Sequence, residues 1–363
     1  MAPQPEFRIP GGSAASVKII DTTSLISKVN FVHTLGPAIE GVPYVPDCPV
    51  WSFLIENAEG RKALFDLGTR KDWKNLAPIV SNRLIKMGWE ITVEKNITEI
   101  LEENGFSLEG FEAVIWSHYH WDHIGNPALF PKNVALVVGP GFNDEFMPGY
   151  PAREDSILLE SDYEGRKLIE IDFQGPRSSK IGQMDAYDFF GDGSFYLLDA
   201  PGHTVAHICG LVRTSCNPDT FILMGADSVH DGGELRPSQF LPIPENINLR
   251  QFLPASIQNT ICPGHVLEDI QRSRGRQANE PFFTGNIAYD LPALIQTIEK
   301  LQHADAQKDV FFIYAHDRTI MDVVDFFPRQ VNDWKSKGWA EQVKWAFLKE
   351  YWQGLKLDKL KAS

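Results

Sequence analysis

The chain has 363 residues, of which 43% are hydrophobic and 23% are charged. This composition provides ample material for a folded core and excludes a disordered, collagen-like or coiled-coil protein. The 48 acidic residues outnumber the 34 lysines and arginines, so the formal net charge is −14. Because neither a basic cluster nor a membrane-length apolar run occurs, we expect no nucleic-acid partner and no membrane partner.

The four cysteines include no C-x-x-C pair, which argues against a disulfide scaffold and against a cysteine zinc site. The first residues lack a basic region followed by an apolar one, so a cytoplasmic location is expected. We predict a flexible tail over residues 1–16 and a single domain over residues 17–363.

Several short apolar runs predict β-strands that end in potential metal ligands. A hairpin is expected where residues 51–55 and 63–66 flank a turn at Gly60. Four further runs cover residues 113–116, 195–198, 221–224 and 310–314, and they lead into Ser117-His118, Asp199, Gly225-Ala226-Asp227 and Ala315-His316. Because neighbouring strand ends meet at one edge of a sheet, these side chains are expected to lie close together.

Other segments read as helices or as an insertion. Helical spacing occurs over residues 71–104 with a break near Gly88, over residues 291–301 behind a cap at Asp290, and after Pro328, where Val343, Phe347 and Tyr351 form one stripe. Residues 231–286 lack such spacing and predict a long insertion, either a lid or a surface elaboration. Its apolar residues, Phe240, Leu241, Phe252, Phe282 and Phe283, would suit a hydrophobic substrate or a contact between two copies, which leaves monomer and homodimer open.

The most informative segment is His118-x-His120-x-Asp122-His123. In an extended backbone, His118 and His120 point to the same side, and a following turn lets Asp122 and His123 face a second point nearby. Imidazole and carboxylate groups suit zinc, iron or manganese better than calcium. The segment therefore predicts a metal site.

This motif resembles the signature of the metallo-β-lactamase superfamily, and further segments similar to that family follow in the expected order. They are Phe65-Asp66-Leu67-Gly68, Asp199-Ala200-Pro201-Gly202-His203-Thr204, Gly225-Ala226-Asp227 and Tyr314-Ala315-His316-Asp317. The resemblance covers roughly residues 17–330. It implies an α/β (α+β) fold, an αββα sandwich of two mixed β-sheets flanked by helices, with two divalent metal ions at the sheet edge.

Carried over position by position, the resemblance assigns seven ligands. Metal one would be held by His118, His120 and His203, metal two by Asp122, His123 and His316, and Asp227 would bridge both. Zinc is preferred, with iron or manganese as alternatives. His265, in Cys262-Pro263-Gly264-His265, also resembles a final ligand of other branches, but we favour His316 because a clean apolar strand precedes it.

Residues around these ligands are expected to have supporting roles. Asp66 and Asp199 would accept hydrogen bonds from the outer N–H groups of the ligand rings, and His207 would be a hydrogen-bonding support. Tyr119 and Trp121 are expected to be packing residues, with lining of the pocket as the alternative.

The helix leading into His316 resembles the N-acyl-homoserine lactonase branch of the family. This implies a small-molecule substrate, a hydrophobic lactone or related carboxylic ester opened by a metal-bridging hydroxide. A metallo-thioesterase of the glyoxalase II or polyketide-release type is the alternative, and an iron-dependent sulfur dioxygenase is a third. Those lactonases carry a tyrosine three residues after the bridging aspartate, where this chain has His230. We expect His230 to donate a hydrogen bond to the substrate carbonyl, and His230 or Asp122 to relay a proton.

Overall fold

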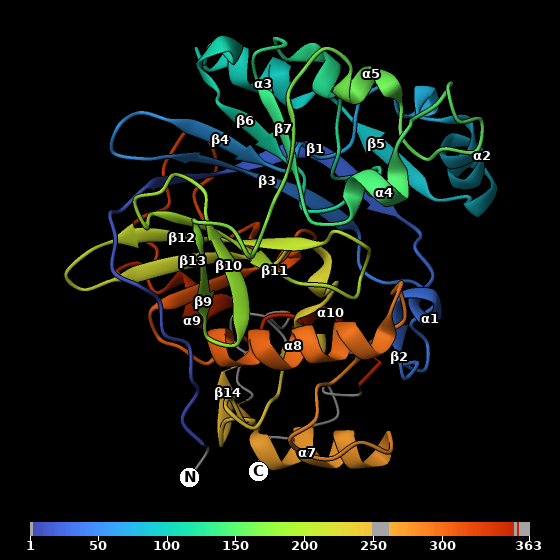
Figure 1. The fold of residues 1–363 in the computed structure, drawn as a ribbon. Coiled ribbons are helices and arrows are strands. Elements are labelled where there is room, and N and C mark those ends of the chain that lie inside the picture. The colour runs from blue at the N-terminus through green and yellow to red at the C-terminus, as the bar shows by residue number, and fades with distance from the viewer. Residues whose placement is uncertain (1–2, 249–260, 352–353, 356–363) are drawn as a thin grey trace.

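The computed structural model describes residues 3–248, 261–351 and 354–355. Two β-sheets pack face to face, and helices cover the outer face of each sheet (Figure 1). The four layers confirm the αββα sandwich expected from the sequence.

The first sheet has seven strands in the order β5-β1-β3-β4-β6-β7-β8. Their bounds are β1 (Ser16–Ser27), β3 (Cys48–Glu56), β4 (Lys62–Phe65), β5 (Glu90–Val93), β6 (Ala113–Ile115), β7 (Ala135–Val138) and β8 (Leu168–Glu170). The strands from β5 to β4 pair antiparallel, whereas β4, β6, β7 and β8 run parallel. The sheet is therefore mixed, as predicted.

The second sheet has six strands in the order β17-β13-β12-β11-β10-β9. They are β9 (Ser178–Ile181), β10 (Met184–Asp188), β11 (Phe195–Asp199), β12 (Ile208–Ser215), β13 (Thr220–Met224) and β17 (Val310–Ile313). Only the pair β13–β17 is parallel, so this sheet is also mixed. Two small ribbons complete the strands, β2 (Leu35–Gly36) with β16 (Thr284–Gly285) and β14 (Asn246–Asn248) with β15 (Ile261–Pro263).

The helices are mostly short. They are α1 (Phe31–Thr34), α2 (Pro78–Met87), α3 (Ile97–Glu103), α4 (Phe142–Phe146), α5 (Glu160–Tyr163), α6 (Gly232–Leu235), α7 (Gly264–Ser273), α8 (Leu291–Asp305), α9 (Trp339–Val343) and α10 (Leu348–Tyr351). Helices α2 to α5 lie over the first sheet, and α8 lies over the second (Figure 1). Within the described ranges, no helix combines the length and the hydropathy needed to cross a membrane.

The apolar strands are explained by burial on both faces. In β3, Phe53 and Ile55 point into the core between the two sheets, while Leu54 points into the core beneath the outer helices. Successive side chains of a strand alternate between its faces, so a strand covered on both sides is apolar at every position. The hairpin of β3 and β4 and the four apolar strands β6, β11, β13 and β17 confirm the sequence prediction.

Residues 71–104 differ from the expected interrupted helix. Helix α2 ends at Met87, and Gly88 follows with a φ of +69°, a conformation that favours glycine. A strand, β5, then pairs with β1 before α3 begins. In β5, Ile91 and Val93 have the two-residue spacing of a half-buried edge strand, which a four-residue segment reveals poorly.

The chain ends are packed more closely than the sequence indicated. Phe7 is buried in the core beneath α8, and the backbone N–H groups of Ser13 and Ala15 donate to carbonyls of residues 192 and 213. The predicted flexible tail over residues 1–16 is therefore corrected for residues 7–15. In the C-terminal segment, the predicted stripe of Val343, Phe347 and Tyr351 is buried, although the helices there are single turns.

The insertion at residues 231–286 forms α6, β14, β15, α7 and β16. Phe282 and Phe283 are buried with Phe31 and Tyr351, so they join the insertion to the first and last parts of the chain. These two rings form core, which differs from the substrate or dimer contact considered from the sequence. Phe252 lies outside the described residues.

A buried ion pair fixes the insertion to α8. Arg236 donates through Nε and Nη2 to the two carboxylate oxygens of Asp305, at 2.8 and 2.6 Å. Replacing Asp305 with asparagine would leave the guanidinium buried beside a neutral amide, and we expect the free energy of unfolding to fall by about 3–5 kcal/mol. Denaturant unfolding at neutral pH measures this. Glu268→Gln, at the exposed pair with Arg272, is the control and is expected to cost less than about 1 kcal/mol; equal losses would contradict the prediction.

Candidate metal centre

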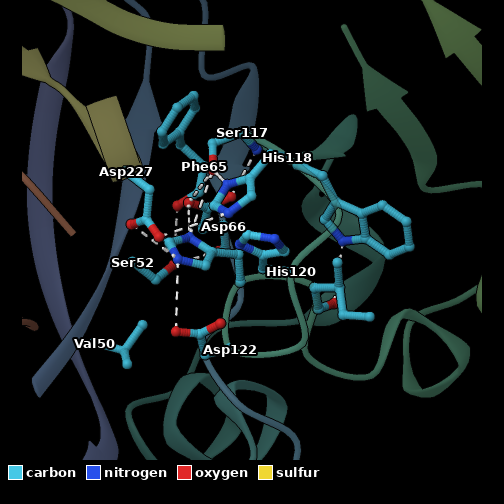
Figure 2. A network of polar contacts seen from close by, with 12 residues as sticks. Val50, Ser52, Phe65, Asp66, Ser117, His118, His120, Asp122 and Asp227 are labelled. Carbon is cyan, nitrogen blue, oxygen red and sulfur yellow. Dashed lines mark hydrogen bonds and ion pairs between the residues drawn. The ribbon is translucent and has the colours of Figure 1, made fainter. Parts of the chain in front are cut away.

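Histidine and aspartate side chains from both sheets meet at one edge of the sandwich. They come from the segments after β6 (His118, His120, Asp122, His123), β11 (His203), β13 (Asp227) and β17 (His316). Figure 2 shows the part of this cluster that follows β6, together with Asp227. The strand-end convergence expected from the sequence therefore exists, because β6 and the three second-sheet strands end at the same edge.

The side chains form two groups with the geometry of ion-binding sites. One group comprises His118, His120, His203 and Asp227, and the other comprises Asp122, His123 and His316. Within each group, one nitrogen or oxygen of every residue lies within 4.8 Å of the others. These are the residue sets assigned from the sequence to metal one and metal two.

Asp227 lies between the two groups, with one carboxylate oxygen toward each. Its Oδ2 is 3.4 Å from Nε2 of His203 and 3.7 Å from Nε2 of His118. Its Oδ1 is 3.2 Å from Nε2 of His123 and 3.4 Å from Nε2 of His316. This placement suits the bridging role expected for Asp227.

The outer ring nitrogens are held by partners outside the cluster. Nδ1 of His123 contacts Asp66 at 2.8 Å, Nδ1 of His316 contacts the carbonyl of Pro49 at 2.9 Å, and Nδ1 of His203 contacts the carbonyl of Ile287 at 3.1 Å. An Nδ1–H donated to an oxygen leaves the Nε2 lone pair free and aimed inward. The hydrogen bonds at Nδ1 therefore orient these rings as metal ligands require.

Asp66 supports His123 directly and His118 through Ser117. Its carboxylate accepts hydrogen bonds from the Ser117 N–H and hydroxyl, both at 2.7 Å, and the same hydroxyl lies 3.0 Å from Nδ1 of His118 (Figure 2). Asp66 follows β4 and has a backbone φ of +60°, which residues other than glycine seldom adopt. The supporting role expected for Asp66 is present in the structure.

Several inward-facing atoms of the cluster are buried without a hydrogen-bond partner among the described residues. They are Nε2 of His118, Nε2 of His123 and Oδ1 of Asp227. Burial lowers the pKa of His118 and His203 well below the usual value and that of His120 to about 3, so these rings are neutral. Burying such groups unpaired costs free energy, and a cation supplies the missing partner. The donor set of imidazole nitrogens and carboxylates therefore fits divalent metal ions.

The close approach of α8 explains why glycine occupies position 202, next to His203. A Cβ at this position would lie 2.1 Å from the backbone nitrogen of Leu294, at the start of α8, and its φ is +127°. Only glycine permits this close approach. The N–H groups of residues 289 and 290 also donate to the carbonyls of His203 and Gly202, so α8 fixes the loop that carries His203.

The surroundings of the other histidines named in the sequence show which of them lie close to the cluster and which do not. His207 is buried, and its Nδ1 contacts the carbonyl of Ala200 at 2.9 Å, in agreement with the expected support. His265 is the second residue of α7 and has an exposed side chain, outside both groups. The structure thus brings His316, and not His265, to the other candidate ligands. Asp199, at the end of β11, lies near Asp185 of β10 and Lys300 of α8. Among the described residues, no hydrogen bond joins it to a candidate ligand ring, so the support expected from it is not seen.

His230 lies beside the cluster. Its Nε2 is 3.3 Å from Oδ2 of Asp227, and its backbone N–H donates to Oε1 of Glu234 at 2.6 Å. Glu234 also accepts from the N–H of Asp231, whose carboxylate accepts from the Tyr351 hydroxyl at 2.7 Å. The N-terminus of α6 and the C-terminal segment together hold His230 in place. The spacing Asp231-x-x-Glu234 is that of a helix capping box, which the sequence could have indicated, whereas the Tyr351 contact has no local signal.

A cavity of about 400 Å³ opens onto the cluster. Its floor contains His120, Asp122, His203, Asp227, His230 and His316, and its walls contain Ile26, Val29, Val45, Ile79, Val80, Leu84, Met87, Trp89, Ile157 and Ile287. Tyr119 and Trp121 also line it, which favours the pocket-lining alternative over packing alone. No sequence pattern indicated that α2 would form a wall, because the packing partner of a helix depends on the tertiary fold.

Comparisons with known proteins agree with this architecture. Residues 45–246 match the family model described as the metallo-beta-lactamase superfamily. The chain is 40% identical to a gamma-lactamase of Fusarium pseudograminearum, FDB1, over 93% of this chain and 83% of that protein. It is 38% identical to the metallo-hydrolase mfmC of Annulohypoxylon moriforme over 97% and 92% of the two chains. It is 39% identical to the cytochrome P450 monooxygenase mpaDE′ of Penicillium brevicompactum, but spans only 38% of that protein's length.

Solved structures share the fold at low sequence identity. A quorum-quenching N-acyl homoserine lactone hydrolase superposes with a TM-score of 0.56 and 14% identity, over 91% of this chain and 100% of that one. A mutant of AiiA from B. thuringiensis, with N-decanoyl-L-homoserine at its active site, gives a TM-score of 0.58 and 15% identity over 88% and 100%. Since the family model covers more than half of the chain and the first relative is 40% identical over most of both chains, this protein belongs to the metallo-β-lactamase superfamily.

Proposed function

We propose that this protein is a metal-dependent hydrolase that opens a lactone or a related carboxylic ester. The observation that supports the proposal most directly is the pair of ligand groups that share Asp227 at the floor of an apolar cavity. The first group would hold one divalent ion and the second group another, with zinc preferred. When bound, such ions supply Lewis acidity toward a carbonyl and a hydroxide nucleophile at neutral pH.

The residues of the chain supply orientation and proton transfer. His230, with Nε2 turned toward the cluster, is placed to donate a hydrogen bond to the substrate carbonyl or to pass a proton to the leaving oxygen. Asp122 is the other candidate for the proton relay, with its Oδ2 3.5 Å from Nε2 of His316. The apolar walls favour a hydrophobic substrate and exclude water around the scissile bond.

A cyclic amide is a second candidate substrate, because two relatives are named gamma-lactamases. Besides FDB1, the protein MBL2 of Gibberella moniliformis is 46% identical over 61% of this chain and 90% of its own length. Lactones and lactams present a similar ring carbonyl, so one site can accommodate either. The poorer nitrogen leaving group makes proton donation to that atom more important, and this would place greater demand on His230.

The deciding experiment is ring opening by the zinc-loaded protein, followed with a pH indicator for lactones and by chromatography for γ-lactams. N-acyl-homoserine lactones, simple γ- and δ-lactones and γ-lactams form the panel, and chelated protein is the control. We expect turnover that the chelator removes and added zinc restores. If protein holding about two ions per chain opens none of these rings, the proposal fails, and acyl thioesters become the next substrates to test.

A further inference from the structure

The cavity above the candidate metal centre has an uneven distribution of charge. Its floor holds two carboxylates, those of Asp122 and Asp227, and among the described lining residues no other carboxylate occurs. Arg83 is the one lysine or arginine among them. In the whole chain, acidic residues exceed lysines and arginines by 14. The part of the cavity away from the floor differs from this average, because its described lining has Arg83 and no carboxylate.

Arg83 is placed to contact a bound molecule. It lies on α2 (Figure 1), several residues of which line the cavity, and its side chain is exposed. Among the residues that the structure describes, none forms a hydrogen bond or an ion pair with the Arg83 guanidinium. The guanidinium is close enough to Tyr119, another lining residue, to oppose the rise that burial causes in the pKa of that phenol.

The surroundings of Arg83 indicate the kind of group it would bind. Its neighbours on the same wall, Ile79, Val80, Leu84 and Met87, are apolar and offer no competing acceptor. A guanidinium presents a planar fork of donors that matches a carboxylate. A single charged group at one end of an apolar pocket fixes the orientation of a ligand whose body fills the pocket.

We propose that the substrate carries a carboxylate remote from its scissile carbonyl and that Arg83 binds this carboxylate at the mouth of the cavity. The substrate would then be held at two points, by its reacting carbonyl on the floor and by its acid group at α2. Arg83 is thus a specificity residue that selects anionic ring substrates over neutral ones. This inference rests on the proposed hydrolysis of a cyclic ester or amide.

Two matched aryl γ-lactones test the inference. One carries a carboxylate and the other a primary carboxamide, each on the aryl carbon farthest from the lactone carbonyl. The two are nearly equal in size and differ in charge. We expect the zinc-loaded protein to favour the carboxylate, and Arg83→Gln to raise its KM about fivefold without changing kcat. The KM for the carboxamide should change less than about twofold. Lys86→Gln is the control, since Lys86 is exposed on α2 but does not line the cavity.

The outcomes separate this inference from the proposed function. Equal KM values for the two lactones, or a preference that survives Arg83→Gln, would overturn the role of Arg83 and leave hydrolysis intact. If neither lactone is opened, the wider panel of lactones and lactams decides the proposed function, and binding decides the inference. Trp89 and Trp121 line the cavity, so tryptophan fluorescence reports the Kd of each lactone. Tighter binding of the carboxylate that is lost in Arg83→Gln, but not in Lys86→Gln, supports it; equal Kd values overturn it.

Discussion

Replacing Asp227 with alanine is expected to lower kcat/KM by at least about 1,000-fold and to remove metal from both ligand groups, because its two oxygens face both. Without this carboxylate, the buried histidines would have to hold two cations with less negative charge to balance them. The fold should persist, since Asp227 belongs to none of the apolar core clusters. Metal analysis of the purified protein, circular dichroism and ring-opening rates measure the three effects.

The matched control for this prediction is Asp199→Ala. Asp199 is the last residue of β11 in the second sheet and is partly buried, whereas Asp227 follows β13 and is buried; Asp199 belongs to neither ligand group. Its replacement should leave metal content and kcat within about twofold. Retention of the full rate and of both ions by Asp227→Ala would show that the bridging assignment is wrong.

Replacing Asp66 with asparagine is expected to weaken metal binding by about 10- to 100-fold while leaving every proposed ligand in place. One carboxylate oxygen of Asp66 accepts from both the Ser117 hydroxyl and the His123 ring, and the other accepts from the Ser117 N–H. An amide nitrogen at either position would face a donor instead of accepting from it. The backbone should tolerate the change, because asparagine adopts a φ near +60° more readily than most residues.

Competition with a chromophoric chelator measures the affinity of the Asp66→Asn protein for zinc. Asp21→Asn is the control, because Asp21 is an exposed aspartate on β1 whose side chain, among the described residues, accepts a hydrogen bond only from the nearby N–H of Thr23. An unchanged zinc affinity in Asp66→Asn would mean that the ring of His123 is oriented by something other than this carboxylate.

The apolar strands and the candidate ligands were predictable because they leave local signals. A continuously apolar strand such as β13 is visible without its neighbours, and Asp227 stands shortly after it. Gly202 could be recognised in the sequence, although the reason for it, the close approach of α8, could not. These features depend on spacing within one segment, which the linear chain records.

The remaining features depend on which distant segments meet. The carbonyls that orient His203 and His316 belong to Ile287 and Pro49, and backbone groups of this kind carry no side-chain signature. The wall formed by α2 and the contact of Tyr351 with Asp231 likewise arise from tertiary packing. For the same reason the aromatic residues of the insertion could not be divided in advance between core and substrate pocket.

Because the candidate ligands come from both sheets, metal binding would stabilise the folded protein. His118 extends from the first sheet and His203 from the second, so an ion shared by them would cross-link the two halves of the sandwich. Binding to the folded state alone would then add about 4 kcal/mol of stability at a free metal concentration about 1,000 times the Kd. Metal supply would set not only how fast the protein works but also how long the folded chain survives heat and proteases.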